Sequence, residues 1–292
     1  MAVILSAAKD LAGAPGAQAR ADSRTGHPSY TPAMTFDPAV SLRIINNQRL
    51  MRATHRGEYR DLAGALALTS DAPIPDWNCL EAFATDDRRI EGVLDIGFAL
   101  LRAFDQPPAA RVTPLDRPSG IEARLARRRL MQQSRATSMV FRGDDAAIRT
   151  NKAVDVRIAT PDDAGAYATI EAQVMAPKAR WGKGFLLGAA LANILELDRT
   201  FYIAYRDAEP AGVALVVREG DVAGIYSVAT LKSHRSNGVA TTLVARAVTD
   251  AKRDGASLIC IECDPAGDAT GVFTAIGFEP AHESSLWLGE VS

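Results

Sequence analysis

Residues 222–251 read VAGIYSVATLKSHRSNGVATTLVARAVTDA, and this stretch carries the strongest pattern in the chain. The apolar and β-branched run Val222–Val228 predicts a strand. From Ala240 to Ala251 apolar residues recur three and four positions apart, which predicts an amphipathic helix. The polar loop between them contains Arg235 and Gly238. The stretch is therefore predicted to be a strand and a helix joined by a loop that leads directly into the helix N-terminus.

The loop Arg235-Ser236-Asn237-Gly238-Val239-Ala240 has the chemistry expected of a phosphate-binding loop. A helix N-terminus offers unpaired backbone N–H groups and the positive end of the helix dipole. Gly238 lets a pyrophosphate approach the main chain, and Arg235 adds a charged contact. An ordinary surface loop with a turn glycine has the same spacing, so the elements around the loop must decide between the two interpretations.

The elements on both sides of this loop predict a mixed α/β domain over residues 154–292. Before it, residues 154–158 predict a strand, and helices follow from a cap at Thr160 to about residue 174 and over about 185–197. Strands at 201–206, 211–219 and 222–228 have short connections, which favour an antiparallel meander. After the helix we expect a strand at 257–263, a short helix near 270–275 and a last strand near 285–288.

The first half of the chain predicts a separate and smaller unit. Residues 1–36 are rich in Ala, Gly, Ser and Pro, which is typical of a disordered tail. Residues 37–142 predict a small α/β domain without a phosphate loop, and residues 143–153 a polar linker. Its expected elements are helices over 38–53 and 90–104, strands over 62–68 and 78–83, and a further strand, helix and strand ending at 141.

Composition argues against several classes of function. No apolar run approaches the roughly 20 residues of a membrane-spanning helix, so we expect a soluble protein without a membrane partner. Four arginines, at 124 and 127–129, lie in a helical pattern where a solvated face is the ordinary explanation, so no nucleic-acid partner is expected. The second half holds 12 Lys and Arg against 18 Asp and Glu, which is compatible with a cationic acceptor.

The three cysteines indicate a reducing, cytoplasmic location rather than a disulfide framework. Cys260 and Cys263 lie three apart on a predicted strand and so face opposite sides, which disfavours a redox or zinc pair. With four scattered histidines, no metal site is expected.

Taken together, these motifs resemble the GCN5-related N-acetyltransferase (GNAT) superfamily, whose signature R/Q-x-x-G-x-G/A lies between a strand and a helix. The residues Ile225–Thr230 resemble the strand before that signature and Ala275–Phe278 the family's Gly-Phe element, so the resemblance covers about residues 154–290. It implies a mostly antiparallel mixed sheet flanked by helices, and acetyl-coenzyme A as cosubstrate. Main-chain groups around Val228 and Thr230 would hold the pantetheine arm, and residues 236–240 the pyrophosphate. The first half resembles, more faintly, the degenerate N-terminal domain of tandem GNAT proteins.

The resemblance also frames the catalytic expectations. Many family members place a tyrosine, the acid for the leaving thiolate, where this chain has Phe273. Glu262, on the strand after the cofactor helix, is the candidate general base, with Glu219 and Glu171 as rivals. Trp181 lies where the family shapes its acceptor site. We expect acetyl transfer to a primary amine of a small molecule or polypeptide; the alternative is a non-catalytic acyl-coenzyme A binding module.

Overall fold

The computed structural model describes residues 36–53, 57–72, 74–175 and 182–290. Its strands are β1 (Glu58–Asp61), β2 (Leu66–Thr69), β3 (Cys79–Glu81), β4 (Ala109–Val112), β5 (Met131–Phe141), β6 (Val154–Ile158), β7 (Arg199–Arg206), β8 (Glu209–Glu219), β9 (Val222–Thr230), β10 (Leu258–Cys263) and β11 (Phe278–Leu288). Its α-helices are α1 (Pro38–Ala53), α2 (Ile90–Ala103), α3 (Ile121–Arg127), α4 (Ala164–Met175), α5 (Gly182–Asn193), α6 (Val239–Arg253) and α7 (Asp268–Ile276).

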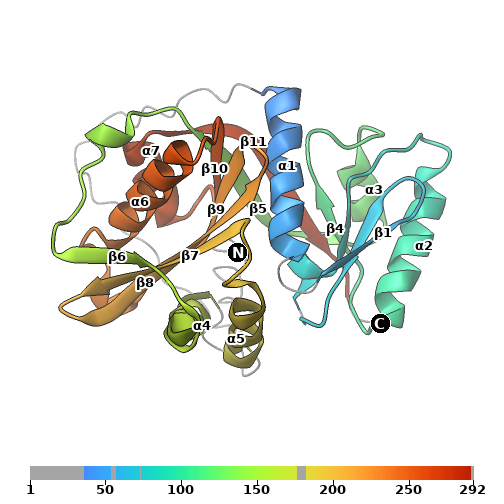
Figure 1. Ribbon diagram of the computed structural model, residues 1–292. Helices are drawn as coiled ribbons and strands as arrows, with labels where there is room; N and C mark the ends of the chain where they lie inside the picture. The colour runs from blue at the N-terminus through green and yellow to red at the C-terminus, as the bar shows by residue number, and fades with distance from the viewer. Residues whose placement is uncertain (1–35, 54–56, 73, 176–181, 291–292) are drawn as a thin grey trace, which may run out of the picture.

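These strands form one mixed sheet in the order β1-β2-β3-β4-β11-β5-β10-β9-β8-β7-β6 (Figure 1). The neighbours β3 and β4 and the neighbours β9 and β10 are parallel, and the other neighbouring strands are antiparallel. Each parallel pair is joined by a helix, α2 in the first half and α6 in the second. The predicted fold class, a mostly antiparallel sheet flanked by helices, is confirmed.

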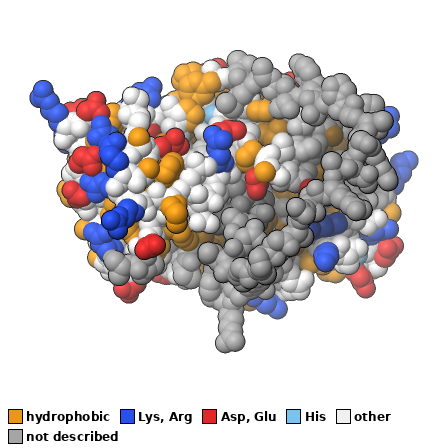
Figure 2. Space-filling model, turned by 180° about the vertical axis from the view of Figure 1, so that it is seen from behind, with side chains coloured by type: hydrophobic (Ala, Val, Ile, Leu, Met, Phe, Trp, Pro, Cys, Tyr) orange, Lys and Arg blue, Asp and Glu red, His pale blue; other side chains and the backbone are white. Residues whose placement is uncertain are grey.

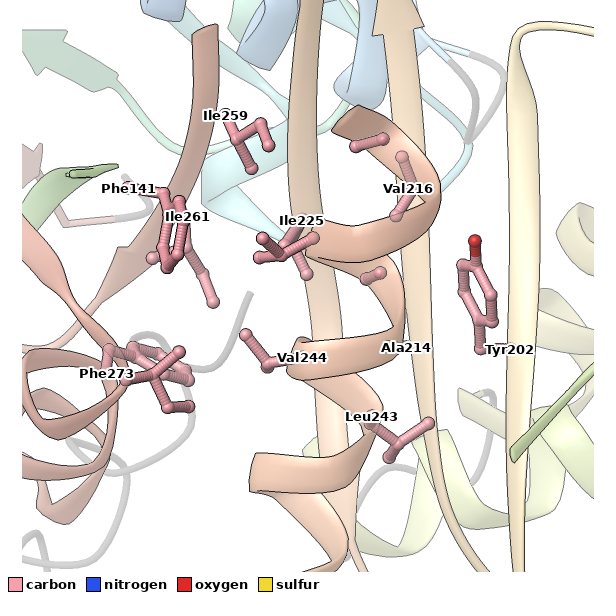
Figure 3. Packing of buried hydrophobic residues seen from close by; sticks show 14 of the residues in the cluster. Phe141, Tyr202, Ala214, Val216, Ile225, Leu243, Val244, Ile259, Ile261 and Phe273 are labelled. Atoms are coloured by element: carbon pink, nitrogen blue, oxygen red, sulfur yellow. The ribbon is translucent and has the colours of Figure 1, made fainter. Parts of the chain in front are cut away.

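The sheet of the second half is covered on both faces. Strand residues such as Ala214, Val216 and Ile225 point to one face and pack against Leu243 and Val244 of α6 (Figure 3). Their neighbours Val213, Leu215 and Tyr226 point to the other face and pack against α4 and α5 and against Met51 of α1. This alternation of strand side chains produces the two apolar layers.

The two halves exchange strands within the common sheet. Strand β5, from the first half, lies between β10 and β11 and pairs antiparallel with both. Strand β11 pairs with β5 along its whole length, residues 278–288, and its last four residues, 285–288, also pair on their other side with β4. Helix α1 stands across the sheet between the helices of the two halves (Figure 1). The division of the chain at residues 143–153 stays a prediction, and the sheet itself is continuous across it.

Most predicted elements are found, and the differences have local causes. The predicted strand at 62–68 is found only from Leu66 on, as β2. The residues before it form a hairpin turn after β1, because the Asp61 carboxylate accepts the amide hydrogen of Ala63, whose φ is 57°. The last strand begins at Phe278 instead of near residue 285. Pro280 lies at a register shift, and the polar His282 and Ser284 are buried, so this strand lacks the usual apolar signature.

The boundaries of two further elements differ from expectation. Helix α5 begins at Gly182 and ends at Asn193, so Leu195 and Leu197 lie beyond it and are exposed. Strand β3 ends at Glu81, followed by Ala82 with a φ of 58°. The predicted tail, residues 1–36, lies outside the described residues except for Phe36.

Cys260 and Cys263 are free, are buried and pack in different core clusters, Cys263 with α6 and Cys260 with α1. Arg124 and Arg128 both contact Glu91 of α2, so they join two helices. In Figure 2 acidic and basic side chains are interspersed on the side of the molecule that α2 and α3 form.

Candidate active site

A fork between β9 and β10 is the central feature of the site. The two strands pair in parallel from Val222 and Leu258 up to Ile225 and Ile261, and there the pairing ends. Strand β9 nevertheless continues to Thr230. Ser227 has a φ of 50° and lies at a register shift between β9 and β8, which is a bulge that turns the strand. The strands therefore part, and main chain at Val228–Thr230 is left beside the opening.

The loop after the fork has the geometry that the sequence predicts. A 3-10 turn, Lys232–His234, is followed by Ser236 with a φ of 60° and Gly238 with a φ of 71°. Gly238 holds the N-cap position of α6, and no described side chain caps this helix. The amide hydrogens of the first turn of α6 therefore have no side-chain acceptor among the described residues. Arg235 is exposed, and its side chain makes no ion pair with the described residues.

Sequence analysis missed a residue that holds this loop in place. Asn151, in the predicted linker, donates from Nδ2 to the Asn237 carbonyl at 2.8 Å. Its backbone N–H donates to Thr242 Oγ1 at 3.1 Å, and that hydroxyl donates to the Gly238 carbonyl at 2.8 Å. These bonds tie the loop to the first turn of α6. The only sequence signal was an asparagine in a polar stretch, which does not reveal a contact 86 residues away.

In the first half, the helix that joins the parallel pair is α2, and a carboxylate of the protein already occupies its N-terminus. Asp86, just before α2, accepts the amide hydrogens of Arg88 and Arg89 at 2.9 and 3.0 Å. A negative charge at this helix N-terminus competes with a phosphate for the same kind of donor. A side chain of the protein therefore already accepts amide hydrogens at the N-terminus of α2, which agrees with the prediction that the first half has no phosphate loop.

A groove of about 790 Å³ opens beside the N-terminus of α6. Thr241 of α6, Gly271 and Val272 of α7, and Ile148 and Arg149 of the segment between β5 and β6 are among the residues that line it. The groove offers polar and apolar surface next to the predicted phosphate loop, which suits the nucleotide end of a coenzyme.

The predicted base Glu262 is half-buried next to the fork. It is the first residue of β10 after the last residue paired with β9, and Gln48 Nε2 donates to its Oε2 at 2.6 Å. Burial raises the pKa of Glu262 and the positive charges of Arg111 and Arg52 lower it, and the net result is a pKa below the usual value. Glu262 is therefore ionised at neutral pH.

The two other candidate bases, Glu219 and Glu171, lie at different distances from the fork. Glu219 is exposed and pairs with Val222, at the end of β9 far from the bulge. Glu171 of α4 is buried, and its burial raises the pKa to about 7 against the opposing effect of the nearby Ser227 hydroxyl. Because Ser227 forms the bulge, the structure brings Glu171 to the fork and leaves Glu219 away from it.

The remaining predicted site residues are less informative. Phe273 of α7 is buried in the core (Figure 3). Its ring centroid lies 6.2 Å from that of Phe278. It has no proton to give to a leaving thiolate. Thr230 Oγ1 is buried and has no hydrogen-bond partner among the described residues. Trp181 lies outside the described residues.

The comparisons agree with this geometry. Residues 160–278 match the sequence model of the acetyltransferase (GNAT) family. The comparison thus finds a GNAT-family domain over this part of the chain, as the resemblance in sequence indicated. No curated protein matches the chain.

Several solved structures share the fold over most of the chain. A GCN5-related N-acetyltransferase from Kribbella flavida is 17% identical with a TM-score of 0.64, covering 87% of this chain and 96% of that protein. A tandem GNAT protein from the clavulanic acid biosynthesis pathway is 17% identical with a TM-score of 0.58, covering 81% and 79%. A GCN5-related N-acetyltransferase from Sphaerobacter thermophilus is 14% identical with a TM-score of 0.60, covering 80% and 82%. At these identities the likeness concerns the fold.

No described helix is long and apolar enough to cross a membrane. Within the same residues no group of three or more His, Cys, Asp and Glu side chains is arranged to hold a metal ion.

Proposed function

We propose that the protein is an acetyl-coenzyme A-dependent N-acetyltransferase that acts on a primary amine of a small molecule or polypeptide. The observation that carries the proposal is the fork between β9 and β10, followed by an uncapped helix that begins at Gly238. An open strand edge suits the amide groups of a pantetheine arm, and the helix N-terminus suits a pyrophosphate.

The proposed cofactor site extends from the fork to the groove. Main chain at Val228 and Thr230 would contact the pantetheine, and residues Ser236–Ala240 the pyrophosphate. Arg235, without an ion pair to a described residue, is available for a phosphate. The groove between α6 and α7 would take the nucleotide end. No metal is needed, because the phosphate charge is met by amides and an arginine.

An amine acceptor must lose a proton before it can attack a thioester. A lysine-like amine with a pKa of about 10.4 is about one part in 2,500 neutral at pH 7, a penalty of about 4.6 kcal/mol. Glu262 is the proposed base, and its ionised state also suits binding of the cationic amine. Glu171 is a second candidate, because a carboxyl with a pKa of about 7 is well matched to proton transfer at neutral pH.

The reaction needs no further group to balance. The amine nitrogen attacks the thioester carbonyl carbon, the C–S bond breaks, and the amine proton passes to the carboxylate. A coenzyme A thiol resembles an ordinary thiol, whose pKa is near 8.5, so the thiolate can leave and take a proton from water. Phe273 in place of the usual tyrosine is compatible with this route.

Titration calorimetry with acetyl-coenzyme A, combined with an assay for free thiol across a library of amines, tests the proposal. We expect binding and amine-dependent thiol release. Binding without turnover across the library would favour the alternative, an acyl-coenzyme A binding module. Absence of binding would refute both functions.

The same assay separates the two carboxyls. Glu262→Gln is expected to lower turnover by roughly 10² or more with coenzyme affinity nearly unchanged, as loss of a general base does. If turnover instead falls in Glu171→Gln, and the acid limb of the wild-type rate profile lies near pH 7, Glu171 is the base and Glu262 is not.

A cytoplasmic location is a further part of the proposal. It is supported by three free, buried cysteines. We propose no nucleic-acid partner, because Arg124 of α3 and Arg128 directly after it are engaged by Glu91 and Asp95 of α2.

A further inference from the structure

Helix α1 lies outside residues 160–278, yet it packs on β8, β9 and β11 (Figure 1). Near its beginning, one nitrogen of Arg43 donates to Asp221 Oδ1 at 2.7 Å and to Ser257 Oγ at 3.2 Å. Asp221 immediately precedes β9 and Ser257 immediately precedes β10. Arg43 therefore connects α1 to the residues directly before β9 and β10.

One turn later, Asn47 joins α1 to β8 and β9. The Tyr226 hydroxyl donates to Asn47 Oδ1 at 2.6 Å, and Asn47 Nδ2 donates to the Val217 carbonyl at 3.1 Å. Asn47 is fully buried. Gly224 makes room for this contact, because a Cβ there would overlap with Asn47 Oδ1. The glycine and the amide are thus matched to each other.

The next residue, Gln48, joins α1 to β10 and β5. Its Nε2 donates to Glu262 Oε2 at 2.6 Å and to Ser138 Oγ at 2.9 Å. Gln48 is 4% exposed. A buried amide that spans two strands has few other orientations that satisfy its hydrogen bonds, so it fixes the carboxylate that it contacts.

These two contacts fall at the fork itself. The last backbone pair between β9 and β10 is Ile225 with Ile261, and the following residues are Tyr226 and Glu262. Consecutive side chains of α1 therefore bind the first residue of each strand beyond the point where the strands part. Beyond the last backbone pair, the two strands are connected to α1 by side-chain hydrogen bonds instead of to each other by backbone hydrogen bonds.

We propose that α1 is a clasp that sets the opening between β9 and β10, and that Gln48 is a positioning residue for the Glu262 carboxylate. The inference rests on the proposed function in taking the fork as the acetyl-coenzyme A site. It gives the first half of the chain a direct part in the site of the second half.

The first test measures the Glu262 carboxyl itself. Its pKa can be followed by carboxyl carbon-13 NMR, with Glu262→Gln to assign the signal. The cationic groups near it are Arg111 and Arg52, and the titratable neighbour is His282, whose pKa burial lowers to about 4. Gln48→Leu keeps these and removes a donor to the ionised form, so the pKa should rise by on the order of one unit. Asn46→Leu, which removes an amide of α1 bonded to Arg49, is the matched control and should leave it unchanged.

The second test measures the opening. In Gly224→Ala the new Cβ displaces Asn47, so acetyl-coenzyme A affinity by calorimetry should fall at least about tenfold. Gly188→Ala is the control, because a Cβ at that position of α5 meets nothing within 4 Å. Thermal unfolding of each variant verifies that it is folded, and Gln48→Met replaces Gln48→Leu if the latter is not.

The outcomes distinguish this inference from the proposed function. An unchanged Glu262 pKa in a folded Gln48 variant overturns the positioning role. Unchanged affinity in a folded Gly224→Ala overturns the clasp. If the wild-type protein fails to bind acetyl-coenzyme A, the proposed function and the clasp's role in binding both fail, while the NMR titration still decides the role of Gln48.

Discussion

Glu171 shows at the scale of one residue how burial changes chemistry. Its carboxyl lies beside a cavity of about 10 Å³, room for one water molecule, which Tyr167, Leu186 and Phe201 also line. The Tyr167 hydroxyl has no hydrogen-bond partner among the described residues. Few groups are present to stabilise a negative charge, and burial therefore raises the pKa to about 7.

This pKa predicts a dependence of stability on pH. The folded-state pKa of Glu171 lies above that of the unfolded chain, about 4.3, so the folded state binds the proton more tightly. Its contribution to the free energy of unfolding should fall as pH rises from about 4.5 to about 7, by about 3 kcal/mol in total. Urea unfolding at several pH values should show this fall in the parent and lose it in Glu171→Gln. An identical pH dependence in both proteins would refute the assignment.

The role of Gly238 depends on its backbone conformation. Its φ of 71° favours glycine, and an added Cβ would meet only Asn151 Cβ, at 3.2 Å. Gly238→Asp should abolish binding of acetyl-coenzyme A measured by calorimetry, because it places a carboxylate where phosphates are expected.

Strain and ligand effects can be separated by a matched control. Gly220→Asp introduces the same side chain at another glycine with positive φ, 58°, in the turn between β8 and β9. It should cost similar stability and leave binding intact. Were Gly238→Asp to bind as tightly as the parent, the loop would not be the phosphate site.

At the scale of elements, the site depends on how the loop before α6 is held. Asn151 lies in the segment between β5 and β6, and it bonds both to the loop and to Thr242 on the first turn of α6. The segment that joins the halves therefore also forms one wall of the site.

Asn151→Ala should weaken acetyl-coenzyme A binding by about 1 kcal/mol, the usual net value of a hydrogen bond, because the loop loses its side-chain anchor. The backbone bond from Asn151 to Thr242 remains, which limits the effect. Calorimetry measures the change in affinity, and Asn46→Ala, which alters an asparagine on α1 away from the loop, serves as the control. Equal affinity in both variants would show that the loop holds its conformation unaided.

At the scale of the whole molecule, the two halves share one sheet. The second half without the first would lack β5, leaving the facing edges of β10 and β11 unpaired, and would expose the apolar surface that α1 covers. Unpaired edges and exposed apolar faces favour aggregation over folding.

A fragment of residues 154–292 should therefore fail to fold, whereas residues 37–292 should unfold in one cooperative transition. Circular dichroism and size-exclusion chromatography of the two fragments test this. A monomeric 154–292 fragment with a cooperative thermal transition would show that the strand exchange is dispensable.

Sequence by itself determined the features that depend on neighbouring residues. The strand, loop and helix around Gly238, the meander β7–β8–β9 and the helices α1, α2 and α6 follow from local periodicity, capping and turn chemistry. The family signature lies in the same local stretch, and it indicated the GNAT fold of residues 160–278.

Only the tertiary structure decided the features that depend on distant residues. The place of β5 between β10 and β11, the burial that raises the pKa of Glu171, and the contact of Gln48 with Glu262 join segments far apart in the chain. Hydrogen bonds and desolvation act over a few ångströms in space, so a pattern read along the sequence does not show which distant groups they connect.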